Sequence, residues 1–219
     1  MPVERPVLYG YWRSSAAYRV RIALNLKGID AEHRSVHLVR DGGDQHRAEY
    51  RELNPQGLVP LLVDNDGTRL SQSLAILEYL DETRPALPLL PEDPAARGRA
   101  RAFAQHIASE IHPLDNLRVL KYLVSELGIS DDAKLAWYRH WVALGLAALE
   151  PQAAELDGAF SLGERPGLVE ICLVPQMYNA RRFDCDLSAY PALTALDARA
   201  RELEAFRLAA PEAQADADP

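Results

Sequence analysis

Residues 7–28 decide the fold, and they read VLYGYWRSSAAYRVRIALNLKG. The run at 7–11 is apolar and aromatic, as in a short buried strand, whereas residues 15–27 repeat apolar side chains at helical spacing. Gly28 then offers a natural C-terminal stop, because glycine readily takes the left-handed conformation that ends many helices. We therefore predict a strand at 7–11 that leads directly into a helix at 15–27.

The segments that follow extend this unit. A second strand is predicted at 33–38, which completes a β-α-β order. Two further strands, at 58–63 and 68–71, flank Asp64-Asn65-Asp66-Gly67, and its Asp-Gly pair is a strong hairpin signal. A helix at 73–83 follows. The order β-α-β, then β-β-α, predicts an α+β, thioredoxin-like N-terminal domain over residues 1–84.

A change of composition marks the end of this domain. Residues 85–94 read PALPLLPEDP, with four prolines in ten positions, and we interpret them as an interdomain linker. Beyond it we expect an all-α helical-bundle domain over 95–210, in which Pro113 should kink or break the first helix. Residues 211–219 hold no large apolar side chain, and we expect a flexible tail. The helical segments predicted for the second domain are 95–127, 131–156, 168–182 and 191–210.

Bulk properties exclude several classes of partner. A formal net charge of -8 argues against nucleic acid or an anionic membrane as the main partner. The two cysteines, Cys172 and Cys185, form no CxxC pair, so neither a disulfide framework nor a zinc site is indicated. His33 and His37 fall on a predicted strand, and we expect no metal. Because no apolar leader or membrane span is evident, we expect a cytoplasmic protein.

The first strand-helix junction carries the chemistry. Arg13-Ser14-Ser15 opens the helix, and a helix N-terminus presents unpaired N–H groups and about half a positive charge, which favour an anion. A thiol with a pKa of about 8.5 becomes mostly thiolate at neutral pH if its pKa falls by about two units. No cysteine is present in this segment, so the thiol has to come from a ligand. The alternative is that the serines only cap the helix.

Two further segments could contact the same ligand. Val59-Pro60 enters a strand, and a cis bond there would turn the backbone of Val59 outward to pair with an extended peptide; an ordinary trans turn is the alternative. Ser71-Gln72-Ser73 precedes the helix at 73–83, and this second helix N-terminus can receive a carboxylate.

Taken together, these segments resemble the glutathione transferase family over essentially the whole chain. Residues 13–24, RSSAAYRVRIAL, are similar to the signature of its zeta class, which includes isomerases of maleyl compounds. Ala16 and Tyr18 stand where many zeta members have Cys and Trp, so a mechanism that needs a protein thiol there is excluded. Gly167 opens a later helix with Glu170 in the position of a family Asp. Further matches are DGG at 41–43, IHPLDN at 111–116, LVPQ at 173–176 and NARRF at 179–183.

The resemblance implies a site for glutathione, used as a cofactor. In the family, equivalent serines contact the sulfur, a backbone ahead of a cis proline pairs with the cysteinyl residue, a Gln-Ser pair holds the γ-glutamyl end, and a glutamine lies near the glycyl end. The corresponding residues here are Ser14 and Ser15, Val59 and Pro60, Gln72 and Ser73, and Gln45.

The expected substrate is a small unsaturated dicarboxylate. Because the chain is acidic, it has to supply local cations for the two carboxylates, and arginine binds carboxylates through paired hydrogen bonds. Arg13 lies beside the proposed sulfur site, and the resemblance brings Arg118 and Arg182 to the same cleft, with Asn116 adding a hydrogen bond. For each arginine taken alone, a solvated surface position is the alternative.

The resemblance implies a homodimeric enzyme in which the glutathione thiolate adds to a cis double bond and leaves after rotation. Maleylacetoacetate is the first candidate substrate, and maleylpyruvate is the alternative. A transferase that conjugates or dehalogenates small α-halo acids would use the same thiolate. A non-catalytic thioredoxin-fold assembly module is the alternative outside enzymes.

Overall fold

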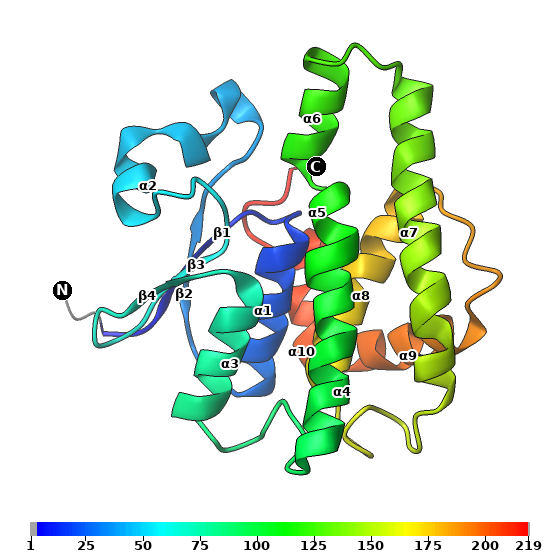
Figure 1. Ribbon diagram of the computed structural model, residues 1–219. Helices are drawn as coiled ribbons and strands as arrows, with labels where there is room; N and C mark the ends of the chain where they lie inside the picture. The colour runs from blue at the N-terminus through cyan, green and yellow to red at the C-terminus, as the bar shows by residue number, and fades with distance from the viewer. Residues whose placement is uncertain (1–3, 219) are drawn as a thin grey trace. The chain divides into compact units, whose positions relative to one another are not determined.

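The computed structural model describes residues 4–218 and divides the chain into two compact units (Figure 1). The first unit comprises Met1–Leu89 together with Leu203–Pro219, and the second comprises Leu90–Glu202. The division between residues 89 and 90 falls within the proline-rich segment. Residues 1–3 of the expected first domain and residue 219 of the expected tail lie outside the described residues.

The first unit is built on a four-stranded sheet in the order β2-β1-β3-β4, with β1 parallel to β2 and the other pairs antiparallel. The predicted thioredoxin-like α+β order is confirmed, and a short helix, α2, is added to it. Six residues are too few to show a helical period, so the sequence pattern missed this helix. The elements are β1 (Val7–Gly10), α1 (Ser15–Leu26), β2 (Glu32–Ser35), α2 (Ala48–Leu53), β3 (Leu61–Val63), β4 (Arg69–Ser71) and α3 (Ser73–Thr83).

Helices cover both faces of this sheet. Tyr50 of α2 belongs to a buried cluster with Leu61 of β3, and Tyr9 of β1 packs against the same cluster. Because neighbouring residues of a strand point to opposite faces, Leu8 and Leu62 face the side that α1 and α3 cover (Figure 1). Both leucines are at most 2% exposed. Helices therefore cover both faces of the central strands β1 and β3, whereas the edge strands β2 and β4 stay partly exposed.

The C-terminal segment returns to the first unit. Helix α10 (Glu204–Ala209) packs against α1, and Asn25 donates from Nδ2 to the carbonyl of Ala205 at 2.9 Å. The single helix predicted at 191–210 is thus two, and residues 203–210 leave the expected all-α domain. Residues 211–218 also differ from the expected flexible tail, since Asp216 and Asp218 accept hydrogen bonds from the first unit. Polar side chains anchor this segment, and its lack of large apolar residues does not reveal them.

The second unit is all-α, as expected. The helix predicted at 95–127 is interrupted, because it becomes π-helical at His106–Ile111 and stops after Leu114. Pro113 explains this, since a proline cannot donate to the helical ladder. The helices of this unit are α4 (Pro94–Gln105), α5 (His112–Leu114), α6 (Leu117–Ser125), α7 (Asp131–Ala154), α8 (Leu168–Arg182) and α9 (Pro191–Glu202).

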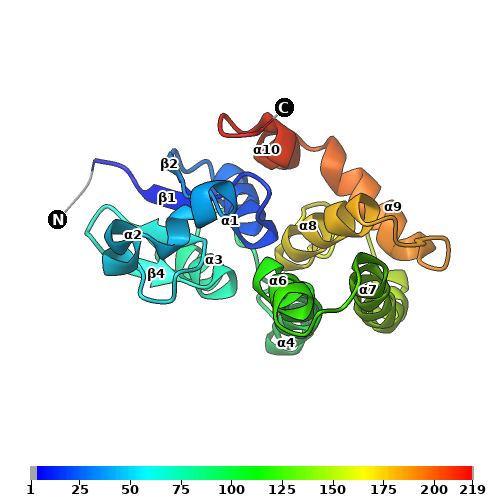
Figure 2. The same ribbon diagram turned by 90° about the horizontal axis from the view of Figure 1, so that it is seen from above.

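Helix α8 is the centre of this unit, and Figure 2 shows it between α4 and α9, against both of which it packs. Its residues 168–177 are all buried, including the polar Glu170 and Gln176. Glu170 stabilises the N-terminus of this helix, because its Oε2 accepts from the N–H of Gly167 at 2.7 Å, and the helix starts at Leu168 as predicted. Among residues 4–218, no helix is long and apolar enough to cross a membrane.

Candidate functional site

Strand register brings the predicted ligand-contacting segments of the first unit together. Tyr9 of β1 pairs with Leu61 of β3, and Leu61 also pairs with Ser71 of β4, so these three residues form one row across the sheet. The chain beyond that row carries the candidate residues. At this end of the sheet, β1 continues to Arg13-Ser14-Ser15, β3 is entered through Val59-Pro60, and β4 continues to Gln72-Ser73.

Ser14 is the N-cap of α1. Its Oγ accepts from the N–H of Ala17 at 3.2 Å, so the structure contains the cap that the alternative reading proposed. The hydroxyl proton is not used by that bond and remains available to donate to an anion. Ser14 is half-buried, whereas Ser15 is buried with 5% exposure. Capping and anion binding are therefore compatible roles for Ser14.

A buried arginine fixes the loop ahead of Ser14. Arg21, 3% exposed, donates from Nη2 to the carbonyl of Trp12 at 2.9 Å and from Nη1 to that of Tyr11 at 3.4 Å. Its Nε donates to the carbonyl of Ala209 at 2.9 Å, which links the loop to the end of α10. Sequence reasoning gave Arg21 no role. The available signal was its position seven residues after Ser14, two helical turns along the same face.

Arg13 is oriented by two aromatic rings. Its guanidinium carbon lies 4.9 Å from the centroid of Trp12 and 5.9 Å from that of Tyr11. Nη2 also donates to the hydroxyl of Tyr11 at 3.3 Å. A guanidinium held by its face against a ring keeps donors along its edge, where a carboxylate binds.

The peptide bond between Val59 and Pro60 is cis, as the family resemblance implied, and not the ordinary trans turn that the local sequence left open. The carbonyl of the preceding Leu58 accepts from the hydroxyl of Tyr50 at 2.6 Å and from Nδ2 of Asn54 at 2.8 Å. Burial raises the pKa of Tyr50 to about 12, so its hydroxyl stays a donor at neutral pH. This segment is therefore fixed from α2 and from the loop that follows it.

Gln72 and Ser73 begin α3. Gln72 has a φ of 72°, in the left-handed region that is uncommon for residues other than glycine and is often retained at ligand sites. Its Nε2 donates to Oε1 of Gln56 at 2.8 Å, a partner that the sequence did not indicate. Ser73, 6% exposed, accepts at Oγ from Nη1 of the buried Arg19 at 3.2 Å.

Gln45 lies in the loop after β2, in a short 3-10 helix at Asp44–His46. Its side chain is 7% exposed, and Nε2 donates to the carbonyl of Leu38 at 3.2 Å. Oε1 is buried and has no hydrogen-bond partner among the described residues. Gly43 makes room for this side chain, because a Cβ there would lie 2.4 Å from Oε1. A buried acceptor of this kind is suited to a backbone donor from a peptide ligand.

The remaining predicted residues belong to the second unit. Asn116 caps α6, since its Oδ1 accepts from the N–H of Arg118 at 3.1 Å, and this leaves Nδ2 as its donor. Arg118 is exposed in the first turn of α6. Arg182, also exposed, ends α8 with its guanidinium 4.9 Å from the ring centroid of Phe183. Arg13 belongs to the first unit, so the convergence of these arginines stays a prediction.

Asp115, in the motif at 111–116, is a residue whose environment the sequence did not reveal. It is 8% exposed, and burial raises the pKa of its carboxyl to about 8. Nearby, Tyr138 stacks on Phe183 with ring centroids 3.8 Å apart. Burial raises the pKa of Tyr138, the charge of Asp115 adds to this rise, and the charge of Arg182 opposes it. Asp115 and Arg182 therefore lie close enough to the same phenol to act on it.

No group of three His, Cys, Asp or Glu side chains suited to a metal ion occurs among residues 4–218. The chemistry described for this site rests on serine, arginine, amide and backbone groups.

Comparisons with known proteins identify the family of this chain. A family model described as the N-terminal domain of glutathione S-transferase matches residues 13–83. A probable maleylacetoacetate isomerase of Vibrio cholerae serotype O1 is 55% identical over 211 residues, which cover 96% of this chain and 98% of that protein.

Two solved structures extend the likeness to the whole fold. A holo maleylpyruvate isomerase, described as a bacterial zeta-class glutathione S-transferase, is 43% identical with a TM-score of 0.92 and covers 97% of this chain and 100% of its own. The maleylacetoacetate isomerase of Anaeromyxobacter dehalogenans 2CP-1, with dicarboxyethyl glutathione and citrate bound in its active site, is 42% identical with a TM-score of 0.86. It covers 98% of this chain and 94% of its own. The chain therefore belongs to the zeta class of the glutathione transferase family.

Proposed function

We propose that this chain catalyses the glutathione-dependent cis-trans isomerisation of a maleyl-type dicarboxylate, with maleylacetoacetate converted to fumarylacetoacetate as the first candidate reaction. The observation that carries the proposal is the pairing of Ser14, whose hydroxyl caps α1 and can still donate, with the aromatic-oriented cation of Arg13 directly before it. The first group suits a thiolate and the second suits a carboxylate of the substrate.

Ser14 and the N-terminus of α1 would stabilise the thiolate of glutathione. We assign the contact with sulfur to Ser14 and a supporting position to the buried Ser15. A fall of about two units in the thiol pKa corresponds to about 2.7 kcal/mol of preference for the thiolate. A helix N-terminus and one hydroxyl donor together supply a stabilisation of that order.

The rest of glutathione would lie along the same end of the sheet. The backbone of Val59 pairs with the cysteinyl residue, and Gln72 and Ser73 at the start of α3 hold the γ-glutamyl carboxylate. Gln45 uses its buried Oε1 to accept from the glycyl N–H. These groups orient the tripeptide so that its sulfur reaches Ser14.

The reaction is an addition followed by an elimination. The thiolate forms a bond to one carbon of the conjugated cis double bond, and the displaced π electrons move to the neighbouring carbonyl as an enolate. The former double bond is now single and rotates. When the enolate collapses, the trans double bond forms and the thiolate leaves, so glutathione is not consumed. The dicarboxyethyl glutathione bound to the Anaeromyxobacter relative has the connectivity of such an adduct.

Arg13, with Arg118, Arg182 and Asn116 from the second unit, would hold the substrate carboxylates. Replacing Arg182 by Ala is expected to raise KM for dicarboxylates and to leave a neutral electrophile unaffected. Arg165→Ala, at another exposed arginine of the second unit, is the matched control. Equal loss with both kinds of substrate would assign Arg182 a structural role.

The reaction itself is tested with maleylacetoacetate and maleylpyruvate, each with and without glutathione, while free glutathione is quantified. Isomerisation that depends on glutathione without consuming it supports the proposal, and the preferred substrate separates the two candidates. Consumption of glutathione with small α-halo acids would favour a transferase, and failure to bind glutathione would favour an assembly module. Activity without glutathione would refute the proposal.

Ser14→Ala tests the thiolate step directly. We expect the pKa of bound glutathione, measured from thiolate absorbance against pH, to rise and turnover to fall. An unchanged titration would move the role to Ser15.

The family resemblance also supports a cytoplasmic homodimer. Sedimentation equilibrium measures the mass of the assembly and tests the dimer.

A further inference from the structure

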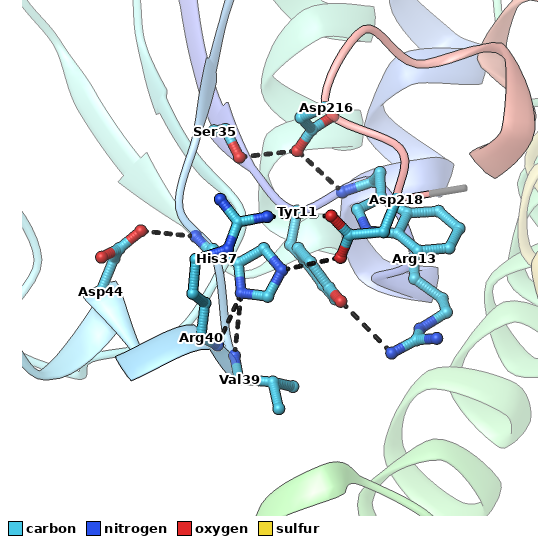
Figure 3. Close-up of polar contacts among 10 residues, drawn as sticks. Tyr11, Arg13, Ser35, His37, Val39, Arg40, Asp44, Asp216 and Asp218 are labelled. Carbon is cyan, nitrogen blue, oxygen red and sulfur yellow. Dashed lines mark hydrogen bonds and ion pairs between the residues drawn. The ribbon is translucent and has the colours of Figure 1, made fainter. Parts of the chain in front are cut away.

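The C-terminal residues 214–218, here called the strap, run beside the loop that opens α1 and the end of β2 (Figure 3). The base of the strap is fixed, because Nε2 of Gln214 donates to the carbonyls of Leu208 and Ala210, both at 2.9 Å. Pro211, just before it, is buried. The strap therefore starts from an anchored point at the end of α10.

Asp216 binds the loop that leads to the proposed thiolate site. Its Oδ2 accepts from the backbone N–H of Trp12 at 3.3 Å and from the hydroxyl of Ser35 at 2.7 Å. The carbonyl of Trp12 is held by Arg21, as described above. Both polar backbone groups of Trp12 are thus held, one by the strap and one by α1, directly before Arg13 and two residues before Ser14.

Asp218 is connected to Arg13 by a series of side-chain contacts that runs through His37 and Tyr11. Its Oδ2 contacts Nε2 of His37 at 3.1 Å, and its Oδ1 accepts from Nη2 of Arg40 at 2.9 Å. Because Nδ1 of His37 accepts from the N–H of Arg40 at 2.8 Å, Nε2 carries the proton and donates. The His37 ring lies edge-on to Tyr11, with centroids 4.9 Å apart, and Tyr11 accepts from Arg13.

These carboxylates, rather than apolar packing, hold the strap in place. A cavity of about 270 Å³ separates part of the strap from the sheet, and its lining includes Leu8, Gly10 and Ala215. The hydrogen bond from His37, together with the charges of Arg40 and Arg13, holds the pKa of Asp218 below its usual value, so this group is a carboxylate at neutral pH.

We propose that the strap positions the substrate and thiolate groups at the start of α1, with Asp216 as the positioning residue that fixes Trp12 and thereby the direction of Arg13 and Ser14. Asp218 holds His37, whose ring packs against Tyr11, the residue that accepts a hydrogen bond from Arg13. The inference rests on the proposed function, because it assigns the strap to the same site.

Three variants separate this role from a general effect on stability. Asp216→Ala removes the acceptor of the Trp12 N–H, whereas Asp216→Asn keeps an acceptor oxygen and removes the charge. Ser35→Ala removes the other partner of Asp216 and leaves Trp12 bound. We expect about a tenfold loss of glutathione affinity for Asp216→Ala, and a change of about twofold or less for the other two variants.

The measurements are calorimetric glutathione affinity, thiolate absorbance of bound glutathione against pH, and hydrogen exchange of the Trp12 amide by NMR. For Asp216→Ala we expect faster Trp12 exchange and a raised thiol pKa, both restored in Asp216→Asn. A chain ending at Ala213 lacks the whole strap and should reproduce the Asp216→Ala results. This second variant keeps the proposal testable if Asp216→Ala perturbs folding.

Unchanged Trp12 exchange and an unchanged thiol titration in Asp216→Ala would overturn the strap proposal. Failure of Asp216→Asn to restore them would also overturn it, because the hydrogen bond would then not be the cause. If the unaltered protein bound no glutathione, the proposed function would fail, and Trp12 exchange would still show whether Asp216 holds the loop. The two failures are therefore distinguishable.

Discussion

Asp115→Asn is expected to change the pH dependence of stability. Asp115 is 8% exposed, and both carboxyl oxygens lack a hydrogen-bond partner among the described residues. Burial raises the pKa of this carboxyl to about 8, whereas an unfolded chain gives Asp a pKa of about 3.9. The folded protein therefore keeps a proton on Asp115 over a pH range in which the unfolded chain has lost it.

The sign and size of the Asp115 contribution to stability follow from the difference between its folded and unfolded pKa values. Because the folded pKa is raised, the contribution to stability is complete below about pH 4 and is lost as the pH rises toward about 8. Each pH unit in that window costs about 1.4 kcal/mol of unfolding free energy, and about four units give a ceiling of about 5.5 kcal/mol. An asparagine of similar shape does not titrate, so the variant lacks this slope.

The assay is urea unfolding of both proteins at intervals from about pH 5 to about pH 8. We expect the unfolding free energy of the variant to rise relative to that of the unaltered protein by about 1.4 kcal/mol for each unit of rising pH. The buried amide can add a difference that is the same at every pH, and this does not change the slope. Asp184→Asn, which removes an exposed charge near Cys185, is the control and should follow the unaltered protein. A difference between Asp115→Asn and the unaltered protein that is the same at every pH would refute the reasoning.

Three further outcomes are expected. Burial raises the pKa of Cys185 to about 11, so iodoacetamide should label it roughly a hundredfold more slowly than a free thiol at neutral pH, and rapid labelling seen by mass spectrometry would contradict this. Glu170→Ala should lower the unfolding free energy by about 3 kcal/mol, measured with urea, because Gly167 and Ser161 lose the acceptor of three hydrogen bonds; a loss near zero would show that water replaces it. Gly43→Ala should weaken glutathione binding, because its Cβ would displace Gln45, and an unchanged calorimetric affinity would exclude Gln45 from the site.

Elements whose bounds depend on neighbouring residues were predicted more accurately than those whose bounds depend on distant contacts. The helices at 73–83 and 168–182 were predicted with the bounds that the structure shows, because apolar periodicity and turn residues report burial along one continuous segment. The second strand was predicted at 33–38 and ends at Ser35, since the N–H of His37 instead binds the carboxylate of Asp44. A side chain seven residues away decided that boundary.

The sequence by itself determined the order of the strands and of the longer helices, the break near Pro113 and the resemblance that identified the family. Each depends on neighbouring residues or on a contiguous motif. Only the tertiary structure decided that one row of the sheet brings together the segments predicted to contact the ligand, that Arg21 holds the loop before Arg13, and that Asp216 returns to the same loop. These contacts join groups far apart in the chain, and a backbone N–H or a buried charge finds its distant partner only once the elements have packed.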